Sequence, residues 1–523
     1  MDPAQALEAS ELARHRVIND TIARGDSRIQ RFYSGAVIFI TGGSGFLGKQ
    51  LIEKLFRACE IKKIFILLRS KKQKTSQERL DELFKDPIYE HVHKVRPNFK
   101  EQIVPVDGDV MEKRLGINDE DWKMITEEVD IIYHGAATTN FTDPLKKATL
   151  TNVHGTQQML HLGKACKKLR CFVYISTAYT PATPERARKP VLEKFYDSPM
   201  SPDTLIQMAE TVSEETMNAI TPMFIKPWPN TYTFTKAIAE DVVRSVGADL
   251  PICIVRPAIV ICALREPIPG WIDKSSVYGP SGYVVGGGLG VLHVMYADKE
   301  ICQDLVPVDL VNNAIISAAH DTVVRRERGD TDIRIYTVTS SRNPIKLRKV
   351  IEEIYSAGMQ QPTPFCIWYA FVRVTTNRLW WYILAWLLHY IPGYLVDGVL
   401  KLLGKKPLLM KVYQKVDKLA AALEYFVTQE WFFQDTNTRE MFWNQSPEDR
   451  TIFNCNMASL EWVSYLSLWC LGCRKYIVND GLTGTLAGRR KQFCFKIAHY
   501  SIIMLFLYLI FKLCSAFYGI VIR

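Results

Sequence analysis

A tyrosine and a lysine four residues apart are the side chains in this sequence best suited to acid–base chemistry. Tyr232 and Lys236 stand in the run YTFTK, and this spacing places both on one face of a helix. A free phenol has a pKa of about 10, and a neighbouring ammonium is expected to lower it. Upstream, Ser176 and Thr177 end an apolar run, where a hydroxyl would hydrogen-bond a substrate carbonyl. The set predicts proton delivery to a carbonyl oxygen, although this spacing alone also occurs in purely structural helices.

A glycine-rich turn follows the first apolar run of the chain. It comprises Thr41, Gly42, Gly43, Ser44, Gly45, Phe46, Leu47 and Gly48, and a helical stretch comes next. Gly42 allows the tight turn, Gly45 lets the backbone approach a pyrophosphate, and Gly48 permits close helix–strand packing. The N–H groups and positive dipole end of the helix then face the phosphates. This strand–turn–helix context predicts a dinucleotide site, with a plain structural turn as the alternative.

Basic residues at the end of the second apolar run bear on the choice of cofactor. Arg69, Ser70, Lys71 and Lys72 stand where NAD-dependent enzymes usually carry a carboxylate for the ribose 2′-hydroxyl. Guanidinium and ammonium groups suit a 2′-phosphate instead. We therefore predict NADPH, with contacts from Arg69 and Lys71. The alternative is a solvated basic loop.

Short apolar runs alternate with longer amphipathic stretches over the first half of the chain. The runs span 36–41, 63–68, 102–108, 130–136, 171–177 and 252–258, and helical stretches such as 48–59 and 153–168 lie between them. Continuous apolar strands separated by helices imply a parallel sheet covered on both faces. We predict an α/β fold with a doubly wound parallel sheet of the Rossmann type. It occupies 36–345, the cofactor-binding reductase domain, after an N-terminal extension over 1–35.

Composition and charge narrow the class of protein. The chain has 523 residues, 48% of them hydrophobic, and a formal net charge of +10. These values exclude a largely disordered chain and suit an anionic substrate or an anionic membrane surface. There is no basic stripe with interleaved aromatics and no zinc-finger spacing, so nucleic acid is not an expected partner.

The twelve cysteines are scattered along the chain, which indicates reduced thiols in a cytosolic setting. Cys470 and Cys473 have the C-x-x-C spacing, but no second pair accompanies them. A zinc site is therefore disfavoured and no metal site is predicted. We favour palmitoylation near a membrane as the role of this pair.

The C-terminus carries an apolar run, 501–522, that is long enough to cross a bilayer. Arg489, Arg490, Lys491 and Lys496 precede this run. By the positive-inside rule, these residues predict a transmembrane tail anchor over 497–522 with the catalytic domain in the cytosol. A buried helix that ends the domain is the alternative, because Lys512 interrupts the run.

A second hydrophobic segment, 364–394, is rich in aromatic residues. Its most apolar part, 379–391, is too short to span a bilayer before Pro392. We expect it to be an interfacial or re-entrant segment, or the lid of an apolar cavity. With the polar helical stretch that follows, it predicts a smaller helical C-terminal domain over 346–490.

In their order along the chain, these features resemble the extended short-chain dehydrogenase/reductases. Further residues that carry the resemblance are Asp109, Val110, His134, Gly135, Ala136, Ala137, Asn152, Gly155, Thr156, Arg256 and Pro257. The resemblance implies that Gly135, Ala136 and Ala137 form the floor of the cofactor site. It also implies an adenine contact from Asp109 and Val110, and further contacts from Asn152, Arg256 and Pro257. Its register favours Thr177 over Ser176 as the partner of the phenol.

A closer resemblance is to the eukaryotic fatty acyl-CoA reductases. It is carried by TGGSGFLGKQLIEKL, ILLRSK, VYISTAY, PNTYTFTKAIAE and RPAIV, and by the stretches 266–273, 279–282, 304–314 and 339–344. The resemblance is strong over 36–345. Over the remainder of the chain, including a stretch at 432–440, only the order of the segments is similar. The segment 180–190 departs from the pattern because it is rich in proline and arginine, which leaves the substrate entrance undefined.

The resemblance implies reduction of a long-chain acyl-CoA to a primary alcohol, through an aldehyde, with two NADPH and release of CoA. Tyr232, assisted by Lys236, would protonate the developing oxyanion, and Thr177 or Ser176 would steady it. Lys236 would also hold the nicotinamide ribose. An apolar tunnel is expected for the acyl chain, with the tail in membrane lipid of the endoplasmic reticulum or, alternatively, the peroxisome. A homo-oligomer is compatible with the sequence, which indicates no stoichiometry.

Two rival functions explain part of the same features. A membrane-bound NADP(H) dehydrogenase of the steroid or sugar type accounts for the glycine turn, Tyr232 and Lys236 but not for the C-terminal domain. A membrane-tethered NADPH-binding scaffold without catalysis accounts for the turn and the tail. The complete set of threonine, tyrosine and lysine argues against the scaffold.

Overall fold

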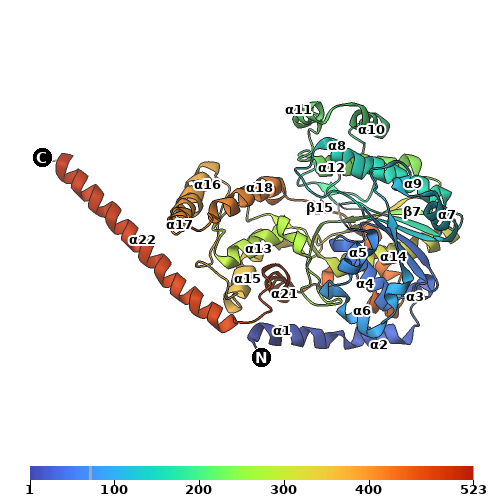
Figure 1. The fold of residues 1–523 in the computed structure, drawn as a ribbon, viewed down its shortest axis with the longest axis horizontal. Helices are drawn as coiled ribbons and strands as arrows, with labels where there is room; N and C mark the ends of the chain where they lie inside the picture. The colour runs from blue at the N-terminus through green and yellow to red at the C-terminus, as the bar shows by residue number, and fades with distance from the viewer. Residues whose placement is uncertain (70–73, 522–523) are drawn as a thin grey trace.

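A seven-stranded parallel sheet forms the centre of the computed structural model, which describes residues 1–69 and 74–521 (Figure 1). Its strands are β1 (Val37–Thr41), β2 (Lys63–Leu68), β3 (Ile103–Asp107), β4 (Ile131–His134), β5 (Cys171–Ile175), β7 (Ile252–Pro257) and β12 (Arg334–Val338). They lie in the order β12-β7-β5-β4-β1-β2-β3, and each neighbouring pair is parallel. The six predicted strands are confirmed, and β12 is an additional one.

Helices cover both faces of this sheet, as the continuous apolar runs predict. The main ones are α4 (Phe46–Ala58) and α14 (Val308–Glu327) on one face and α9 (Gly155–Ala165) and α12 (Thr231–Val246) on the other. Within β1, Ile38 belongs to the core under α4 and α14, whereas Phe39 belongs to the core under α9 and α12. The predicted doubly wound α/β fold is therefore confirmed.

Smaller elements complete this part of the chain. The helices are α5 (Ser76–Leu83), α6 (Glu90–Val95), α7 (Asp119–Glu128), α8 (Leu145–Thr149), α10 (Pro202–Thr211), α11 (Glu214–Phe224) and α13 (Pro280–Leu289). Short strands pair as β6 (Pro190–Val191) with β15 (Phe432–Phe433), β8 (Ile259–Ile261) with β11 (Leu305–Pro307), β9 (Val294–Tyr296) with β14 (Arg373–Thr375), and β10 (Cys302–Gln303) with β13 (Ile345–Lys346). Two of these pairs, β6–β15 and β9–β14, join the first part of the chain to the C-terminal part.

The order of the strands locates a ligand crevice. From β1 the chain continues outward to β2 and β3, then returns to β4 on the other side of β1. In open parallel sheets, ligands bind at the carboxyl ends of the strands where the order reverses in this way. The crevice therefore lies at the ends of β1 and β4, where the glycine turn begins.

The N-terminal extension consists of α1 (Pro3–Leu12), α2 (Arg16–Arg24) and α3 (Arg28–Tyr33), and it packs on the body at both ends. The Tyr33 hydroxyl donates to the carbonyl of Ile316 at 2.9 Å. At the other end, the Asp2 carboxylate caps α1 and accepts from the Thr485 N–H at 2.9 Å. The extension thus connects the sheet to the base of the C-terminal helix.

The C-terminal part is helical, as predicted. It contains α15 (Leu347–Gln360), α16 (Arg378–Ala385), α17 (Ile391–Leu402), α18 (Leu409–Thr428), α19 (Thr436–Trp443), α20 (Pro447–Ile452), α21 (Trp462–Gly472) and α22 (Thr485–Val521). The prediction that the apolar segment ends at Pro392 is wrong. A π-helical turn, η7 (Trp386–Tyr390), joins α16 to α17, so that the helix continues past the proline. The wider turn accommodates the missing N–H and the ring of proline.

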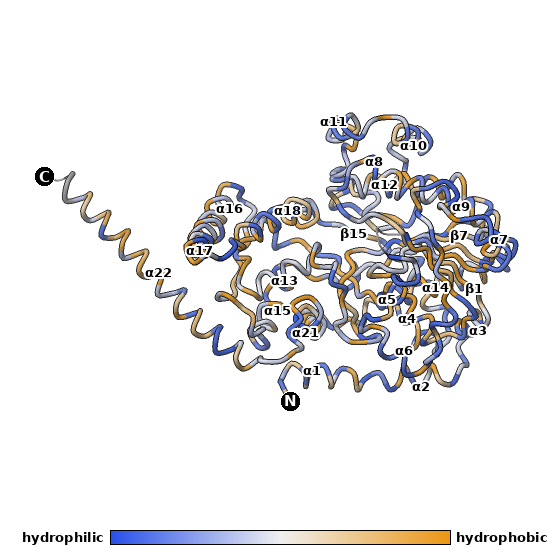
Figure 2. The backbone as a smooth tube through the Cα atoms, viewed as in Figure 1, coloured by the Kyte–Doolittle hydropathy of each residue, from blue (hydrophilic) through white to orange (hydrophobic). Residues whose placement is uncertain are grey.

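Two helical stretches in the described part of the chain are long and apolar enough to cross a membrane: Arg378–Leu402 and Thr485–Tyr518. The second lies in α22, whose outer part leaves the body as an isolated helix (Figure 1). Figure 2 shows hydrophobic residues along α22 beyond a hydrophilic base. This isolation excludes the buried helix that was the alternative to a tail anchor.

Candidate active site

The glycine turn has the shape that a dinucleotide requires. Gly42 has a φ of +77°, and a Cβ there would lie 2.7 Å from the backbone of Gly135. A Cβ at Gly48 would lie 2.3 Å from the carbonyl oxygen of Gly42, so only glycine lets α4 approach the strand so closely. Gly45 caps α4 and has no side chain to occupy the N–H groups of the first turn. Those groups are left to bind an anion, and the residues therefore fit a pyrophosphate.

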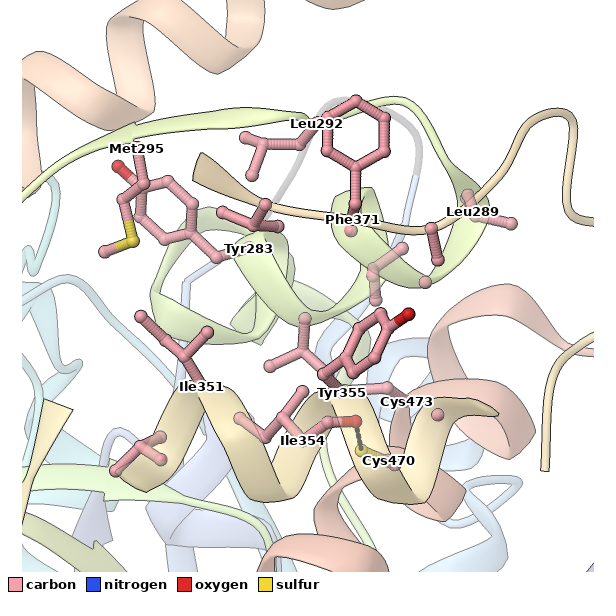
Figure 3. Close-up of a pocket in the computed structure, with 18 of the residues that line it drawn as sticks. Tyr283, Leu289, Leu292, Met295, Ile351, Ile354, Tyr355, Phe371, Cys470 and Cys473 are labelled. Carbon is pink, nitrogen blue, oxygen red and sulfur yellow. Dashed lines mark hydrogen bonds between the residues drawn. The ribbon is translucent and has the colours of Figure 1, made fainter. Parts of the chain in front are cut away.

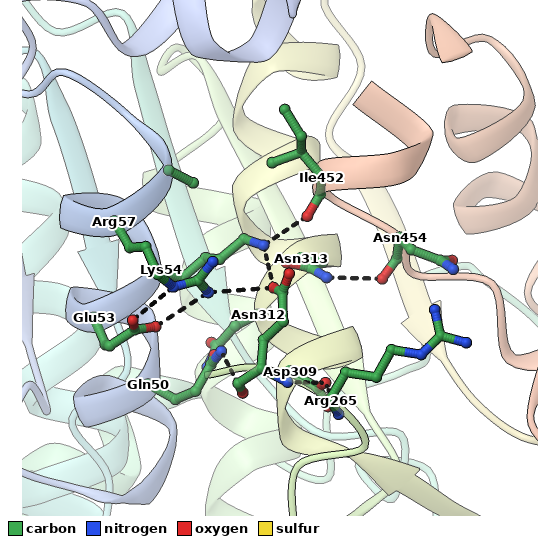
Figure 4. A network of polar contacts seen from close by, with 12 residues as sticks. Gln50, Glu53, Lys54, Arg57, Arg265, Asp309, Asn312, Asn313, Ile452 and Asn454 are labelled. Atoms are coloured by element: carbon green, nitrogen blue, oxygen red, sulfur yellow. Dashed lines mark hydrogen bonds and ion pairs between the residues drawn. The ribbon is translucent and has the colours of Figure 1, made fainter. Parts of the chain in front are cut away.

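A buried polar network holds α4 behind this turn (Figure 4). Lys54 forms an ion pair with Glu266 and donates to the Ile452 carbonyl at 2.6 Å. Arg57 pairs with Glu53 at 2.7 Å. Because a buried charge is costly without partners, the contacts of Lys54 and Arg57 with Glu266 fix α4 against a distant segment.

Asn312 on α14 contacts the turn itself. Its amide donates to the Leu47 carbonyl at 3.0 Å and to the Gln50 side chain at 2.6 Å. The turn is therefore held from α14 as well as by its own glycines.

Arg69 and Asp109 lie together at the ends of β2 and β3, with 3.7 Å between the guanidinium and the carboxylate. Both are partly exposed, whereas Val110 is buried and touches the position of Gly155. The structure thus brings Arg69 and Asp109 together beyond the glycine turn, and their contacts with the adenosine end stay a prediction. Lys71 lies outside the described residues.

The end of β4 is connected to the turn through Thr41. The Ala136 N–H donates to the Thr41 hydroxyl at 3.2 Å, and this hydroxyl lies 2.7 Å from Nδ1 of His134. Burial, together with the charge of Lys236, lowers the pKa of His134 to about 3, so this imidazole is neutral. The half-buried Gly135, Ala136 and Ala137 follow at the crevice.

Asn152 lies in a π-helical turn, η5 (Leu150–His154), between α8 and α9. Its side-chain oxygen accepts from the Thr138 N–H at 3.0 Å, and its amide donates to Thr235 on α12 at 2.9 Å. Asn152 therefore connects the strand end of β4 to the helix that carries Tyr232.

Tyr232 stands in the first turn of α12, which Asn230 caps by accepting from the Thr233 N–H at 2.9 Å. The Thr177 side chain lies close enough to the phenol to lower its pKa, while its hydroxyl accepts from the Tyr179 N–H at 3.3 Å. Ser176 instead donates to Glu240 at 2.6 Å. The structure brings Thr177 to the phenol and directs Ser176 away from it, because adjacent residues after β5 point to opposite sides.

Lys236 is buried one turn later on α12. Its ammonium donates to the Ile175 carbonyl at 2.8 Å and to the Tyr174 hydroxyl at 3.2 Å. Burial lowers its pKa to about 7, against the opposing effect of Glu240. The amine is thus held toward the end of β5, beside the crevice.

The prediction that Lys236 lowers the pKa of Tyr232 is wrong. Burial raises the pKa of Tyr232 to about 12, and the neighbouring Thr177 side chain offsets only part of that rise. The ammonium makes its hydrogen bonds to Tyr174 and Ile175 rather than to the phenol. Tyr232 consequently keeps its proton at neutral pH.

Arg256 and Glu240 form a buried ion pair with two short contacts, 2.9 Å and 2.5 Å. Arg256 also donates to the Lys194 carbonyl at 3.0 Å, and Glu240 is the acceptor for Ser176. The structure therefore places Arg256 in a packing network next to the site. The Pro257 carbonyl accepts a hydrogen bond from the Ala178 N–H at 2.9 Å, at the base of the same segment. Glu240 was not predicted, since a lone acidic residue on a helix carries no signal in the sequence.

Aromatic side chains connect the phenol to an apolar cavity. Phe141 stacks on Tyr232 with 5.8 Å between ring centroids, and Phe426 lies 5.3 Å from Phe141. Phe426 lines a cavity of about 470 Å³ enclosed by α13, α15, α18 and α21 (Figure 3). The volume is within the range of roughly 300–1,000 Å³ found for small-molecule sites.

The walls of the cavity are chiefly aliphatic and aromatic. Among them are Tyr283, Leu292, Met295, Ile351, Ile354 and Phe371. Cys470 and Cys473 face the same cavity and are buried, so the folded chain does not offer them for palmitoylation, and that prediction is wrong. Their buried thiols are part of the apolar wall.

The chain is similar to known families and structures over most of its length. Two family models, each described as male sterility protein, match residues 40–315 and 388–480, and the first is an NAD-binding model. The chain is 35% identical to the fatty acyl-CoA reductase wat of Drosophila melanogaster over 92% of each sequence. It is also 35% identical to fatty acyl-CoA reductase 1 of Mus musculus over 88% of each.

The likeness to solved structures is at the level of the fold. The terminal R domain from the myxalamid PKS-NRPS biosynthetic pathway matches with a TM-score of 0.58 at 20% identity, covering 84% of this chain and 91% of that chain. With the glycine turn, the matched NAD-binding model makes the crevice a site for a nicotinamide dinucleotide. The resemblance predicted from the motifs is confirmed by the extent and identity of the matches: the chain belongs to the fatty acyl-CoA reductase family.

Proposed function

We propose that this protein reduces long-chain fatty acyl-CoA to the primary fatty alcohol, with release of CoA, at the expense of two NADPH. The observation that carries the proposal is the position of the Tyr232–Thr177 pair. It lies between a dinucleotide crevice and an apolar cavity large enough for a lipid chain. The names of the relatives support the same substrate class.

Tyr232 is the proton donor in this proposal. Two nicotinamide cofactors, bound in turn, would supply one hydride each: the first to the thioester, and the second to the aldehyde that forms when CoA leaves. Each reduction consumes one proton, and the carbonyl oxygen gains negative charge as it proceeds. Because burial raises the pKa of Tyr232 to about 12, the phenol holds a proton until such an oxyanion forms beside it.

Thr177 and Lys236 support the phenol in different ways. The Thr177 side chain lies beside Tyr232, where its hydroxyl donates to the same oxygen. With its pKa lowered to about 7, Lys236 takes up and releases protons at neutral pH. In its protonated form it also presents positive charge to the ribose side of the crevice. Ser176 serves as a positioning residue through Glu240.

The preference for NADPH rests on Arg69. Its side chain is 56% exposed at the edge of the crevice, and the nearby Asp109 is 24% exposed. A guanidinium at this position forms a bidentate contact with a 2′-phosphate, whereas NADH offers it only a hydroxyl. We infer that NADPH is used in preference to NADH, and a ratio of kcat/KM values measures the preference.

We infer that the acyl chain occupies the cavity and that its thioester lies at Phe141, next to Tyr232. Phe426 stands between this residue and the cavity, so it forms the passage from the reacting carbon to the tail. The alcohol leaves through the same passage. An apolar wall of this kind favours long chains, because each buried methylene contributes about 0.8 kcal/mol.

We further infer that α22 is a tail anchor that leaves the body of the protein in the cytosol. Basic residues at 489–491 and 496 precede its apolar part, as the positive-inside rule requires. The endoplasmic reticulum is our proposed location, with the peroxisomal membrane as the alternative.

Tyr232→Phe tests the proposal. The variant removes one hydroxyl and retains the ring that stacks on Phe141. We expect turnover of palmitoyl-CoA to fall about 10²–10⁴-fold, the usual contribution of a general acid. NADPH binding, measured by fluorescence titration, should stay unchanged. Unchanged turnover would contradict the role of the phenol.

A further inference from the structure

The membrane helix is part of the cavity wall. Gln492, His499 and Tyr500 of α22 all line the cavity. Gln492 is buried, accepts from the Ala370 N–H at 3.0 Å and donates to the Trp368 carbonyl at 3.1 Å. The apolar run begins at the next residue after Tyr500. One end of the cavity therefore lies at the base of the apolar part of α22.

A second apolar surface lies on the continuous helix α16–η7–α17, residues 378–402. Its large exposed hydrophobic residues are Leu379, Trp380, Tyr382, Ile383, Trp386, Leu387, Ile391, Tyr394, Leu395, Val396, Val399 and Leu402. They occupy adjacent positions and thus cover a broad arc of the helix rather than a single stripe. A contiguous surface of this kind marks an interaction site with a partner or a membrane.

The opposite side of the same helix is fixed to α18. His389 stacks on Tyr413 with 4.9 Å between ring centroids. The Asp397 carboxylate accepts from the N–H groups of Leu408, Leu409 and Met410, each at 2.9 Å, and so caps the start of α18. A helix crossing the bilayer would lose these contacts. The helix is therefore built to lie along a surface with one side on the protein and one side outward.

The charges around this surface fit an anionic bilayer. Six exposed lysines lie in or just after the helix: Lys401, Lys405, Lys406, Lys411, Lys415 and Lys418. Asp417 is the only acidic residue in the sequence between 398 and 423. Lysines beside an apolar face with tryptophan and tyrosine are typical of helices that lie in the membrane interface. The basic residues before the apolar part of α22 likewise suit contact with anionic lipid.

The helices that carry the two surfaces lie on the same side of the body. Figure 1 shows α16, α17 and the outer part of α22 projecting on the same side of the body, away from the sheet. α13 and α15, which line the cavity, lie between the sheet and these helices.

We propose that α16–η7–α17 lies in the interface of the cytosolic leaflet that α22 spans. The two contacts then hold one end of the cavity against the bilayer, and the acyl chain of the substrate and the product alcohol pass between cavity and lipid. The second half of this proposal rests on the proposed function, whereas the first half depends only on the structure. A second protein copy is the competing occupant of the exposed surface.

Thiol labelling of the full chain in nanodiscs with anionic lipid tests the membrane contact. Cys494 and Cys514, which are exposed, are first replaced by serine. Cysteine is then introduced as Leu379→Cys or Leu395→Cys, and as Val17→Cys on α2 for a control. The three side chains are 71%, 67% and 66% exposed in the structure, so without a membrane they should react alike.

We expect a charged maleimide to react at least about tenfold more slowly at 379 and 395 than at 17, because a side chain in the interface is shielded from water. A dye attached at 395 should be quenched by lipids brominated on the acyl chain. Equal labelling rates would overturn the proposal. Protection without quenching would also overturn it and would indicate a protein partner instead. Neither measurement requires turnover, so failure of the proposed function leaves this test intact.

The passage of the acyl chain through the lipid is tested separately. In the double variant Leu395→Glu and Val399→Glu, carboxylates are expelled from the bilayer interface, so kcat/KM for palmitoyl-CoA in vesicles should fall about tenfold. Water-soluble octanoyl-CoA should be reduced as by the unaltered protein, and Val17→Glu should change neither. An equal loss for both substrates, or no loss for either, would contradict passage through the bilayer.

Discussion

Replacing Lys236 with methionine tests how far the amine of the active site is removed from water. Burial lowers its pKa to about 7 from an ordinary value of 10.5. Below pH 7 the folded protein therefore carries the Lys236 charge in its interior, where the loss of hydration lowers stability. A difference of roughly 3.5 in pKa corresponds to about 5 kcal/mol of lost stability under those conditions.

The sign of the pH dependence follows from proton binding. Between pH 7 and pH 10.5 the unfolded chain still binds the proton that the folded chain has released, so stability rises with pH. From pH 6 to pH 9 this group alone raises the free energy of unfolding by about 3 kcal/mol. Lys236→Met removes that rise.

Urea unfolding of the detergent-solubilised full chain at pH 6 and pH 9 measures the effect. Tyr174→Phe is the matched control, because it removes the hydroxyl that bonds to the amine at 3.2 Å but leaves the amine in place. The control should lower stability by about 1 kcal/mol at both pH values and keep the pH dependence of the unaltered protein. If Lys236→Met also kept that dependence, the amine would not be desolvated and the reasoning would be refuted.

Three further substitutions address the glycine turn and the choice between the Thr177 and Ser176 hydroxyls. Gly48→Ala places a methyl group 2.3 Å from a backbone carbonyl and should weaken NADPH binding about tenfold or more, the equivalent of 1–3 kcal/mol of overpacking. A fluorescence titration measures this, and unchanged affinity would count against the predicted cradle. Thr177→Val should lower kcat about 10²-fold or more, as loss of an oxyanion contact does. Ser176→Ala should reduce stability by about 1 kcal/mol and leave kcat within a few-fold. A larger loss of kcat in Ser176→Ala than in Thr177→Val would show that the two hydroxyls have the opposite roles.

The sheet and the cofactor crevice could be predicted because their signals are local. Each strand is a continuous apolar run, and the spacing of Gly42, Gly45 and Gly48 is itself the shape of the turn. β12 was not predicted, since Thr337 interrupts its apolar residues and leaves no continuous apolar run. Its place in the sheet depends on pairing with β7 some 80 residues earlier, at Arg334 opposite Cys253.

The active site could be predicted in its residue types but not in its electrostatics. The spacing of Tyr232 and Lys236 gives a common helix face, yet it does not show that the amine bonds to Tyr174 and the Ile175 carbonyl. Those partners come from β5, far away in sequence. The pKa of the phenol therefore rises with burial, where proximity to the lysine predicted a fall.

The cavity was expected, but its walls could not be identified from the sequence. They come from helices far apart in the chain, from α13 to α22, and only packing brings them together. The same is true of the long helix through Pro392. From the sequence, Pro392 is expected to end the helix. In the structure a π-helical turn precedes the proline, and the helix continues.

The ratio of NADPH oxidised to CoA released tests the central claim most directly. The full chain in membranes is given palmitoyl-CoA, and both products are followed in the same sample. Reduction of the thioester to the alcohol at one site predicts two NADPH per CoA, with little free aldehyde. One NADPH per CoA with accumulating aldehyde, or CoA release without NADPH oxidation, would contradict it.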